Sequence, residues 1–354
     1  MTILNLIRPE FASLVPYRPG GDELKNRLHA NELPKAPLAL LDLQLNQYPD
    51  YQLERELQSQ LASYYQASPE QIALTRGSDD GIDLLMRLFL VAGQDSILQC
   101  PPTFPMYSFY AQLQNAAVIN CPLDIQDFSL NLDQLFSSWQ PGCKIVMICR
   151  PNNPTGNCLD IDSVALICEQ FANKAAVVVD EAYIDFSTGE SAVQLLPRFD
   201  NLIVLRTLSK AFGLAALRLG AVIANERFIH ELKKIIPPYH LASPVLKAAS
   251  LALKNQNWFT GVIQSILEER ERIVEKLGEL QWIEAIFPSE ANFILIKSRH
   301  SAAIQIWLAS HDIAIRRLPP AFGLENTLRI TVGEAQQNNQ LLDALYRFNS
   351  AGGV

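Results

Sequence analysis

Four short polar segments, each directly after an apolar run, carry the residues of this sequence that could do chemistry. Within the third and fourth segments stand a carboxylate, Asp180, and a lysine, Lys210. No carboxylate occurs within nine residues of Lys210. A buried ammonium without a partner loses its proton or is costly, so this lysine either reaches water or is a reactive amine. The segments are RGSDDG at 76–81, RPNNPTGN at 150–157, DEAYIDF at 180–186 and TLSK at 207–210.

The residue types in these segments suit pyridoxal phosphate. This cofactor requires a lysine that bonds to its aldehyde and a carboxylate at its pyridinium nitrogen. Lys210 and Asp180 can fill these two roles. Asn153 and Tyr183 are suitable hydrogen-bond donors to the oxygen on the cofactor ring.

The cofactor phosphate and ring face need further partners, and the same segments contain them. A phosphate is held by helix N–H groups, hydroxyls and an arginine fork. RGSDDG opens a predicted helix, so Ser78 and Asp79 lie at a positive helix end, although a plain N-cap role is the alternative. Phe104, in CPPTFPMY, could cover the ring face. The remaining phosphate candidates are Thr207, Ser209 and Arg218.

The composition argues against several other classes of protein. A net charge of −8 and a pI of about 5.2 disfavour binding to nucleic acid or an anionic membrane. The six cysteines form no CxxC pair and the five histidines no HxxxH pair, so we expect no metal site and reduced thiols. No GxGxxG or GxxxxGK[ST] motif follows a predicted strand. A small diffusible substrate is therefore expected.

The beginning of the chain does not resemble a secretion signal. In MTILNLIRPEF the apolar run is interrupted by Arg8, Pro9 and Glu10. No stretch approaches the roughly 18 uninterrupted apolar residues of a membrane span. We therefore expect a cytoplasmic protein without a membrane partner.

Short apolar strands alternate with amphipathic helices along the first two thirds of the chain. Such β-branched strands are typical of a mostly parallel sheet that helices cover on both faces. In sheets of this kind ligands bind beyond the carboxyl ends of the strands, where the four polar segments stand. The predicted strands are 72–75, 96–99, 116–120, 144–149, 175–179, 202–206 and 221–224, and the predicted helices lie near 52–65, 78–90, 105–114 and 162–172.

The two ends of the chain have a different sequence pattern. Long predicted helices over about 244–278 are followed by shorter strands at 293–297, 312–316 and 327–332, which favours a smaller α+β domain. The proline-containing N-terminus predicts an extended arm. We expect an arm at 1–46 that joins the small domain and a dimer interface, a large cofactor-binding domain at 47–245 and a small domain at 246–354.

Taken in order, these segments resemble fold-type I pyridoxal-phosphate aminotransferases, and within them the histidinol-phosphate branch. The resemblance covers nearly the whole chain and implies an α/β fold with a large and a small domain. The matching stretches are HANELP (29–34), YPDYQ (48–52), RGSDDGIDLL (76–85), CPPTFPMY (100–107), PNNPTGN (151–157), VDEAYIDF (179–186), TLSKAFGLAALRLG (207–220), ANFIL (291–295) and LRITVG (328–333).

The resemblance implies a role for each matching residue of the cofactor site. Lys210 corresponds to the Schiff-base lysine and Asp180 to the pyridinium partner. Asn153 and Tyr183 then bind the ring oxygen, and Thr207, Ser209 and Arg218 bind the phosphate. Tyr48 is similar to the tyrosine that reaches this phosphate from the neighbouring subunit, which implies a homodimer with shared active sites.

Substrate-binding residues are implied in the same way. Arg329 matches the arginine that binds the anionic end of the substrate, and Asn153 also faces the substrate. Arg316 matches an arginine that holds the substrate phosphate, with the adjacent Arg317 as an alternative. Tyr17 resembles a substrate-side tyrosine of the arm.

The implied reaction is transamination between L-histidinol phosphate and 2-oxoglutarate in histidine biosynthesis, which gives imidazole-acetol phosphate and L-glutamate. Alternatives are an aminotransferase for aromatic or other amino acids, a threonine-phosphate decarboxylase, and a cofactor-binding regulator without enzymatic activity. The regulator would need a basic DNA-binding module, which the sequence does not provide. A purely structural α/β protein would leave Lys210, Asp180, Tyr183 and Arg218 as coincidences.

Overall fold

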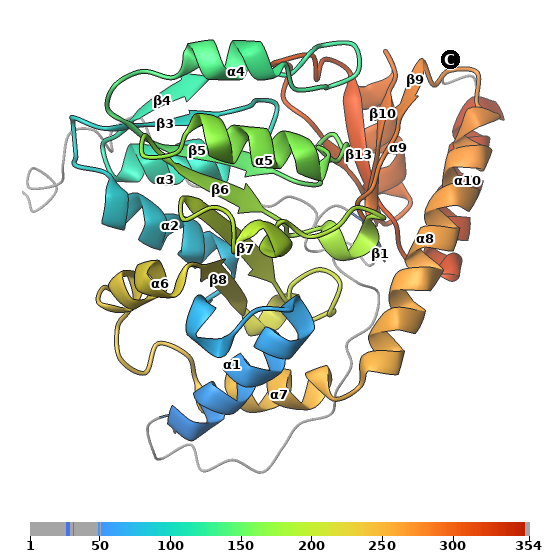
Figure 1. Ribbon diagram of the computed structural model, residues 1–354. Helices are drawn as coiled ribbons and strands as arrows, with labels where there is room; N and C mark the ends of the chain where they lie inside the picture. Colours follow the sequence, from blue (N-terminus) through green and yellow to red (C-terminus); the bar gives the residue numbers. More distant parts are fainter. Residues whose placement is uncertain (1–25, 29–30, 32–48, 50, 351–354) are drawn as a thin grey trace, which may run out of the picture.

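A seven-stranded sheet forms the centre of the larger of two lobes in the computed structural model, which describes residues 26–28, 31, 49 and 51–350 (Figure 1). The sheet has the strand order β2-β8-β7-β6-β5-β3-β4. All neighbours pair in parallel except β8, which is antiparallel to both β2 and β7. The strands are β2 (Ile72–Thr75), β3 (Ser96–Gln99), β4 (Ala117–Asn120), β5 (Cys143–Cys149), β6 (Ala176–Asp180), β7 (Leu202–Thr207) and β8 (Gly220–Ala224).

Helices cover both faces of this sheet, as the wholly apolar strands predict. Side chains of α2 (Ser78–Phe89), α3 (Met106–Leu113) and α6 (Glu226–Lys233) pack in one apolar cluster on one face. On the other face lie α1 (Tyr51–Tyr65), α4 (Leu132–Ser138), α5 (Ile161–Gln170) and α7 (Ser243–Leu253). Alternate residues of β6 enter the two clusters, Val177 one and Val178 the other. The expected mostly parallel α/β fold is confirmed.

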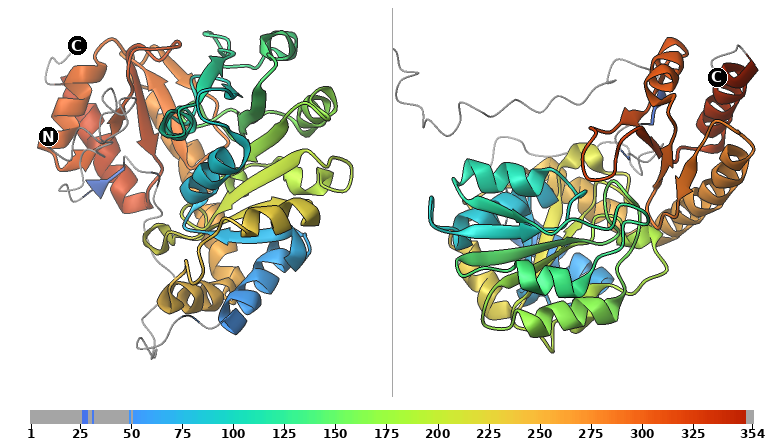
Figure 2. Two further views of the ribbon diagram at one scale, coloured as in Figure 1. Left: turned by 90° about the vertical axis from the view of Figure 1, so that its left-hand side faces the viewer. Right: turned by 90° about the horizontal axis from the view of Figure 1, so that it is seen from above.

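The smaller lobe stands to one side of the large sheet and is joined to it by the long helix α8 (Gln256–Gly278) (Figure 2). Its antiparallel sheet has the order β12-β13-β10-β9. The strands are β9 (Ala285–Phe287), β10 (Phe293–Lys297), β12 (Arg316–Arg317) and β13 (Thr327–Thr331), with helices α9 (Ser301–Ser310) and α10 (Ala335–Ser350) beside them. The predicted domain boundary at residue 245 falls inside α7, and the division stays a prediction.

One predicted strand, 312–316, proved to be two. β11 (Ile313–Ala314) pairs in parallel with β1 (Asn26–Arg27) of the N-terminal arm, whereas β12 pairs with β13. The strand is divided because its two halves take partners from different parts of the chain. Short 3-10 helices complete the described elements: η3 (Pro69–Gln71), η4 (Ile184–Phe186), η5 (Ala192–Leu195) and η6 (Ala215–Leu217).

Two predicted site residues, Tyr17 and Tyr48, lie outside the described residues, as does nearly all of the predicted arm. Within the described part of the chain, no helix combines the length and the apolar character that a membrane span requires.

Candidate active site

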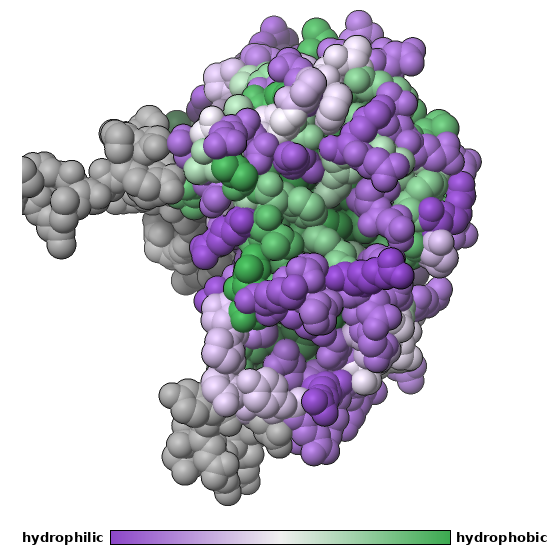
Figure 3. All heavy atoms as spheres, turned by 60° about the vertical axis from the view of Figure 1, so that its left-hand side comes forward, coloured by the Kyte–Doolittle hydropathy of each residue, from purple (hydrophilic) through white to green (hydrophobic). Residues whose placement is uncertain are grey.

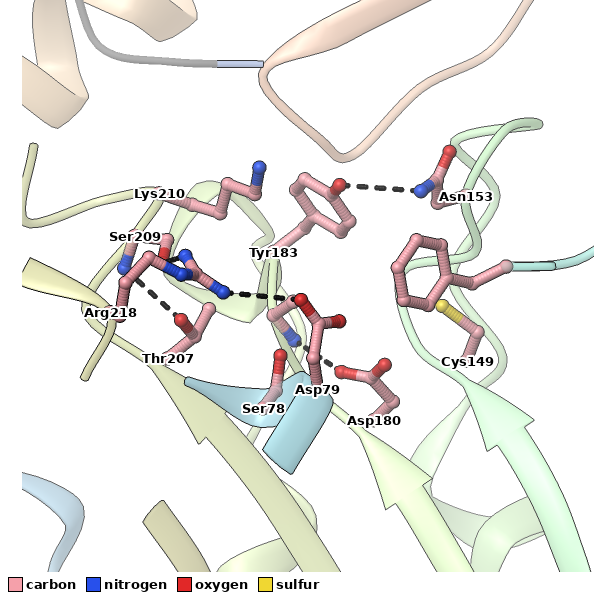
Figure 4. A pocket seen from close by; sticks show the side chains of 12 residues that line it. Ser78, Asp79, Cys149, Asn153, Asp180, Tyr183, Thr207, Ser209, Lys210 and Arg218 are labelled. Atoms are coloured by element: carbon pink, nitrogen blue, oxygen red, sulfur yellow. Dashed lines mark hydrogen bonds and ion pairs between the residues drawn. The ribbon is translucent and has the colours of Figure 1, made fainter. Parts of the chain in front are cut away.

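The polar segments meet at the carboxyl ends of three adjacent parallel strands, β5, β6 and β7 (Figure 4). Asp180 is the last residue of β6, and Thr207 is the last residue of β7. Ten of the residues predicted from the sequence line one pocket there. They are Ser78, Asp79, Phe104, Asn153, Asp180, Tyr183, Thr207, Ser209, Lys210 and Arg218.

The N-terminus of α2 opens toward this pocket without a side-chain cap. Its N-cap residue is Gly77, with φ of 82°, so Ser78 begins the helix and does not cap it. A Cβ on Gly77 would lie 2.8 Å from Arg218 Nη2. A Cβ on Gly220 would lie 2.7 Å from the backbone of Gly77 and Ser78. Two glycines therefore let this helix start lie close to Arg218, with its first N–H groups available to an anion.

Arg218 is held at the pocket by residues from two segments. Its Nη1 donates to Ser209 Oγ at 3.3 Å, and its Nη2 donates to Asp79 Oδ2 at 3.1 Å. The backbone N–H of Ser209 donates in turn to Thr207 Oγ1 at 3.1 Å. The Asp79 carboxylate thus orients Arg218, and only the backbone N–H of Asp79 suits a phosphate.

Asp180 is a buried carboxylate that lacks a cationic partner within the described residues. Its side chain accepts hydrogen bonds from the Tyr107 hydroxyl at 2.7 Å and from the Ala182 backbone N–H at 3.1 Å. Burial raises the pKa of Asp180 to about 6, although these hydrogen bonds oppose the shift. A buried carboxylate is stabilised by a nearby cation, so the position favours a cationic ligand group.

Tyr183 joins the Lys210 side of the pocket to the Asn153 side. Its hydroxyl accepts from Asn153 Nδ2 at 3.4 Å and from Asn31 Nδ2 at 3.1 Å, and Lys210 Nζ lies 5.8 Å from the centre of its ring. Burial raises the pKa of Tyr183 well above its usual range. The phenol is therefore protonated at neutral pH and can donate a hydrogen bond to a ligand.

The small lobe contributes Arg329 from the middle of β13. Its Nη1 donates to Asn153 Oδ1, and its guanidinium lies 5.3 Å from the centre of the Phe293 ring. Arg316 pairs directly with Arg329 across β12 and β13. Arg317 pairs with Leu328, whose side chain is buried. Because successive residues of a strand alternate between faces, Arg317 projects from the face opposite to that of Arg316 and Arg329.

Comparison with known proteins shows the family of this chain. Residues 21–345 match the model for "Aminotransferase class I and II". Histidinol-phosphate aminotransferase 1 of Legionella pneumophila (strain Lens) is 51% identical over 351 residues, which cover 99% of this chain and 96% of the relative. The chain belongs to the class I and II aminotransferases. Histidinol-phosphate aminotransferase of Salmonella typhi is 37% identical over 98% of this chain and 97% of its own length.

Solved structures with the same fold span more than one activity. Histidinol-phosphate aminotransferase from Sinorhizobium meliloti, in complex with pyridoxal-5'-phosphate, has a TM-score of 0.87 at 23% identity and covers 98% of both chains. L-threonine-O-3-phosphate decarboxylase from Porphyromonas gingivalis has a TM-score of 0.74 at 20% identity, over 92% of this chain and 99% of its own. The fold alone therefore does not select the substrate of this aminotransferase.

The pocket of this aminotransferase fits pyridoxal phosphate, the cofactor of the family. The buried Asp180 has no cation within the described residues, which suits a pyridinium nitrogen. The uncapped start of α2 stands beside Arg218 and Ser209, which suits a phosphate. Lys210 lines the same pocket, which suits the lysine that this cofactor needs for its aldehyde.

Four residues of this site were not predicted from the sequence, and one of them, Ala182, lines the pocket and donates its backbone N–H to Asp180. Cys149, the last residue of β5, lines the pocket beside Asp180. Tyr107 and Asn31 donate to Asp180 and Tyr183, respectively. Both lie inside matched stretches, CPPTFPMY and HANELP, but their partners are 73 and 152 residues away in the chain. Only the matched stretches themselves pointed to this region.

Proposed function

We propose that this aminotransferase moves the amino group of L-histidinol phosphate to 2-oxoglutarate and forms imidazole-acetol phosphate and L-glutamate, a step of histidine biosynthesis. The observation that carries this proposal is the direct pairing of Arg316 with Arg329 beside Asn153. Two adjacent guanidinium groups on one face suit a phosphate dianion. The proposal agrees with the names of the relatives.

The chemistry divides between the cofactor and the residues around it. When bound, pyridoxal phosphate supplies an electron-accepting ring that makes the Cα proton of an attached amine acidic. Lys210 holds the cofactor at rest, and its amine takes the proton from the substrate Cα. The carboxylate of Asp180 binds the ring nitrogen and keeps it cationic. Tyr183 and Asn153 donate to the ring oxygen.

The remaining pocket residues position the cofactor. Thr207, Ser209 and Arg218 bind its phosphate together with the first N–H groups of α2. Phe104, which lines the pocket, covers the ring face and keeps water away from it. Asn153 and Arg329 are hydrogen-bonded to each other, so a substrate anion at Arg329 would lie beside the ring oxygen.

The substrate phosphate is assigned to Arg316, in preference to Arg317. Arg316 shares a face of the small sheet with Arg329, whereas Arg317 lies on the opposite face. The role of Tyr17 at the substrate remains a prediction, because this residue lies outside the described part of the chain.

A homodimer with shared active sites is also part of the proposal. The aromatic rings of Tyr51 and Tyr239 lie 5.4 Å apart, and the two residues are 54% and 42% exposed. Figure 3 displays hydrophobic residues that reach the surface across the middle of one side of the molecule. Exposed apolar surface of this kind is typical of a protein interface.

The shared site can be tested by mixing two impaired variants, Lys210→Ala and Tyr48→Phe. If Tyr48 completes the partner's site, a mixed dimer contains one site with both native residues, and mixing should restore activity. No gain in activity on mixing would contradict shared sites.

The cytoplasm is proposed as the location because all six cysteines are free thiols, which a reducing compartment maintains.

The substrate assignment is tested by comparing kcat/KM for L-histidinol phosphate and L-phenylalanine, with 2-oxoglutarate as the acceptor. We expect about 100-fold preference for histidinol phosphate, since charge-assisted hydrogen bonds contribute roughly 1.5–3 kcal/mol each. Equal values would contradict the proposal and favour an aromatic aminotransferase. Release of CO₂ from O-phosphothreonine would instead indicate a decarboxylase.

A further inference from the structure

Tyr107 is a buried tyrosine that stands behind the active-site carboxylate. It is fully buried on α3, and its ring meets the Phe104 ring edge-on with centroids 5.7 Å apart. Its hydroxyl donates to Asp180 Oδ2 at 2.7 Å. Phe104 lines the pocket, whereas Tyr107 does not. One turn of chain therefore provides both a ring for the pocket wall and a hydroxyl for the buried carboxylate.

The hydrogen bond from Tyr107 opposes the effect of burial on Asp180. Among the described residues, Tyr107 is the side chain that donates to this carboxylate, and the other donor is the Ala182 backbone N–H. Burial disfavours the ionised carboxylate and a hydrogen bond to it favours the ionised form. Tyr107 itself stays a donor, because burial and the adjacent Asp180 raise its own pKa.

The ionisable groups around Asp180 do not favour its ionised form in the resting protein, so this effect depends on Tyr107. Asp79 at the start of α2 and Glu181 next in the chain both raise the pKa of Asp180. Cys149 pairs with Asp180 across β5 and β6, and burial raises the pKa of its thiol, so it is neutral. Lys210 lines the same pocket as Asp180. In the proposed resting state this amine is committed to the cofactor.

We propose that Tyr107 is a positioning residue, which keeps Asp180 ionised and fixes the direction of its carboxylate toward the cofactor nitrogen. This inference rests on the proposed function, in which Asp180 binds that nitrogen. With phenylalanine at position 107, Asp180 would take up a proton at a higher pH. A protonated Asp180 must lose its proton before it can pair with a pyridinium, so cofactor affinity would fall near neutral pH.

The first test titrates Asp180 directly in the cofactor-free protein. The infrared band of its protonated carboxyl group is isolated as the difference between each protein and its Asp180→Asn derivative. We expect a midpoint near pH 6 for the native chain. Tyr107→Phe should raise the midpoint by about one pH unit, the size expected from loss of a charge-assisted hydrogen bond.

Tyr64→Phe is the matched control. The Tyr64 hydroxyl also donates to a partly buried carboxylate, Asp185 Oδ1 at 3.0 Å, away from the pocket. This variant should leave the midpoint of Asp180 unchanged. An unchanged midpoint in Tyr107→Phe, or an equal shift in Tyr64→Phe, would overturn the inference.

The second test measures the Kd of pyridoxal phosphate as a function of pH. Tyr107→Phe should weaken binding by about threefold at pH 6.5 and by nearly tenfold at pH 5, with little loss above pH 8, because Asp180 is then ionised in both proteins. A loss of affinity that is equal at all pH values would indicate a merely structural role. Transamination by the native protein is measured separately, so failure of the proposed function is distinguished from failure of this inference.

A substitution with the opposite expected effect on the midpoint of Asp180 tests the inference if the Tyr107→Phe variant does not fold. Site-specific replacement of Tyr107 by 3-fluorotyrosine keeps the hydroxyl and makes it a stronger donor. The midpoint of Asp180 should then fall below that of the native chain. A midpoint that rises or does not move would contradict the proposed role of Tyr107.

Discussion

Arg316 and Arg329 face each other directly across strands β12 and β13 of the small lobe. Directly opposed residues of an antiparallel pair project from the same face, and like charges in such a pair destabilise a sheet. The pair therefore indicates a binding function, and Arg329 is already hydrogen-bonded to Asn153 at the cofactor pocket. This register also separates Arg316 from Arg317, which the sequence left as alternatives.

Replacing the two arginines of β12 individually tests their separate roles. We predict that Arg316→Ala lowers kcat/KM for histidinol phosphate by roughly 10- to 100-fold, because a charge-assisted pair with phosphate is lost. Arg317→Ala, on the opposite face, is the control and should change kcat/KM by less than about twofold. Equal losses in both variants would show that the register does not select the phosphate ligand.

Asp180→Asn should stabilise the cofactor-free protein at alkaline pH. Burial raises the pKa of Asp180 from 3.8 to about 6, so the folded chain binds this proton more tightly than the unfolded chain. The associated stability is present below pH 4 and is lost as the pH rises through 6. At pH 8 the ionised carboxylate costs about 3 kcal/mol, which Asn avoids.

Urea unfolding of the two cofactor-free proteins measures this difference. The gain in unfolding free energy should be about half as large at pH 5 as at pH 8. In the same variant, transamination should fall, since the partner of the ring nitrogen is lost. A gain that does not depend on pH would contradict the assigned pKa of Asp180.

Gly220→Ala should damage the phosphate-binding end of the pocket. The added methyl would lie 2.7 Å from the backbone of Gly77 and Ser78, so the start of α2 must shift. We predict a loss of about 1–3 kcal/mol in unfolding free energy and weaker binding of pyridoxal phosphate. Gly261→Ala on α8 is the control, because a Cβ there has no atom within 4 Å. It should gain up to about 1 kcal/mol and bind the cofactor normally.

Much of the fold could be predicted from short-range patterns. β2 and β3 begin and end at the predicted residues, because four-residue apolar runs with turn residues on both sides mark a buried strand. The antiparallel direction of β8 could not be predicted, since its apolar composition is similar to that of the parallel strands of the same sheet. The division of 312–316 into β11 and β12 depends on pairing with Asn26–Arg27, nearly 300 residues away.

The active site was predictable where a residue follows a strand or matches a family segment. Lys210 and Asp180 stood out because each follows an apolar run. Tyr107 has the appearance of an ordinary core residue on an amphipathic helix, and only the fold brings its hydroxyl to Asp180. Asn31 is buried and its backbone is in the left-handed region, with φ of 54°, which asparagine tolerates. Its hydrogen-bond partner, Tyr183, is 152 residues away in the chain. Side-chain partners across such distances require the tertiary structure.

The central claim is that Lys210 carries the cofactor of this aminotransferase. Its most direct test is borohydride reduction of the protein loaded with pyridoxal phosphate, followed by proteolysis and mass spectrometry. The account predicts that the reduced cofactor is recovered on the peptide that contains Lys210 and that Lys210→Ala abolishes both the label and transamination. Recovery of the label on a different lysine, or native protein that binds no cofactor, would contradict it.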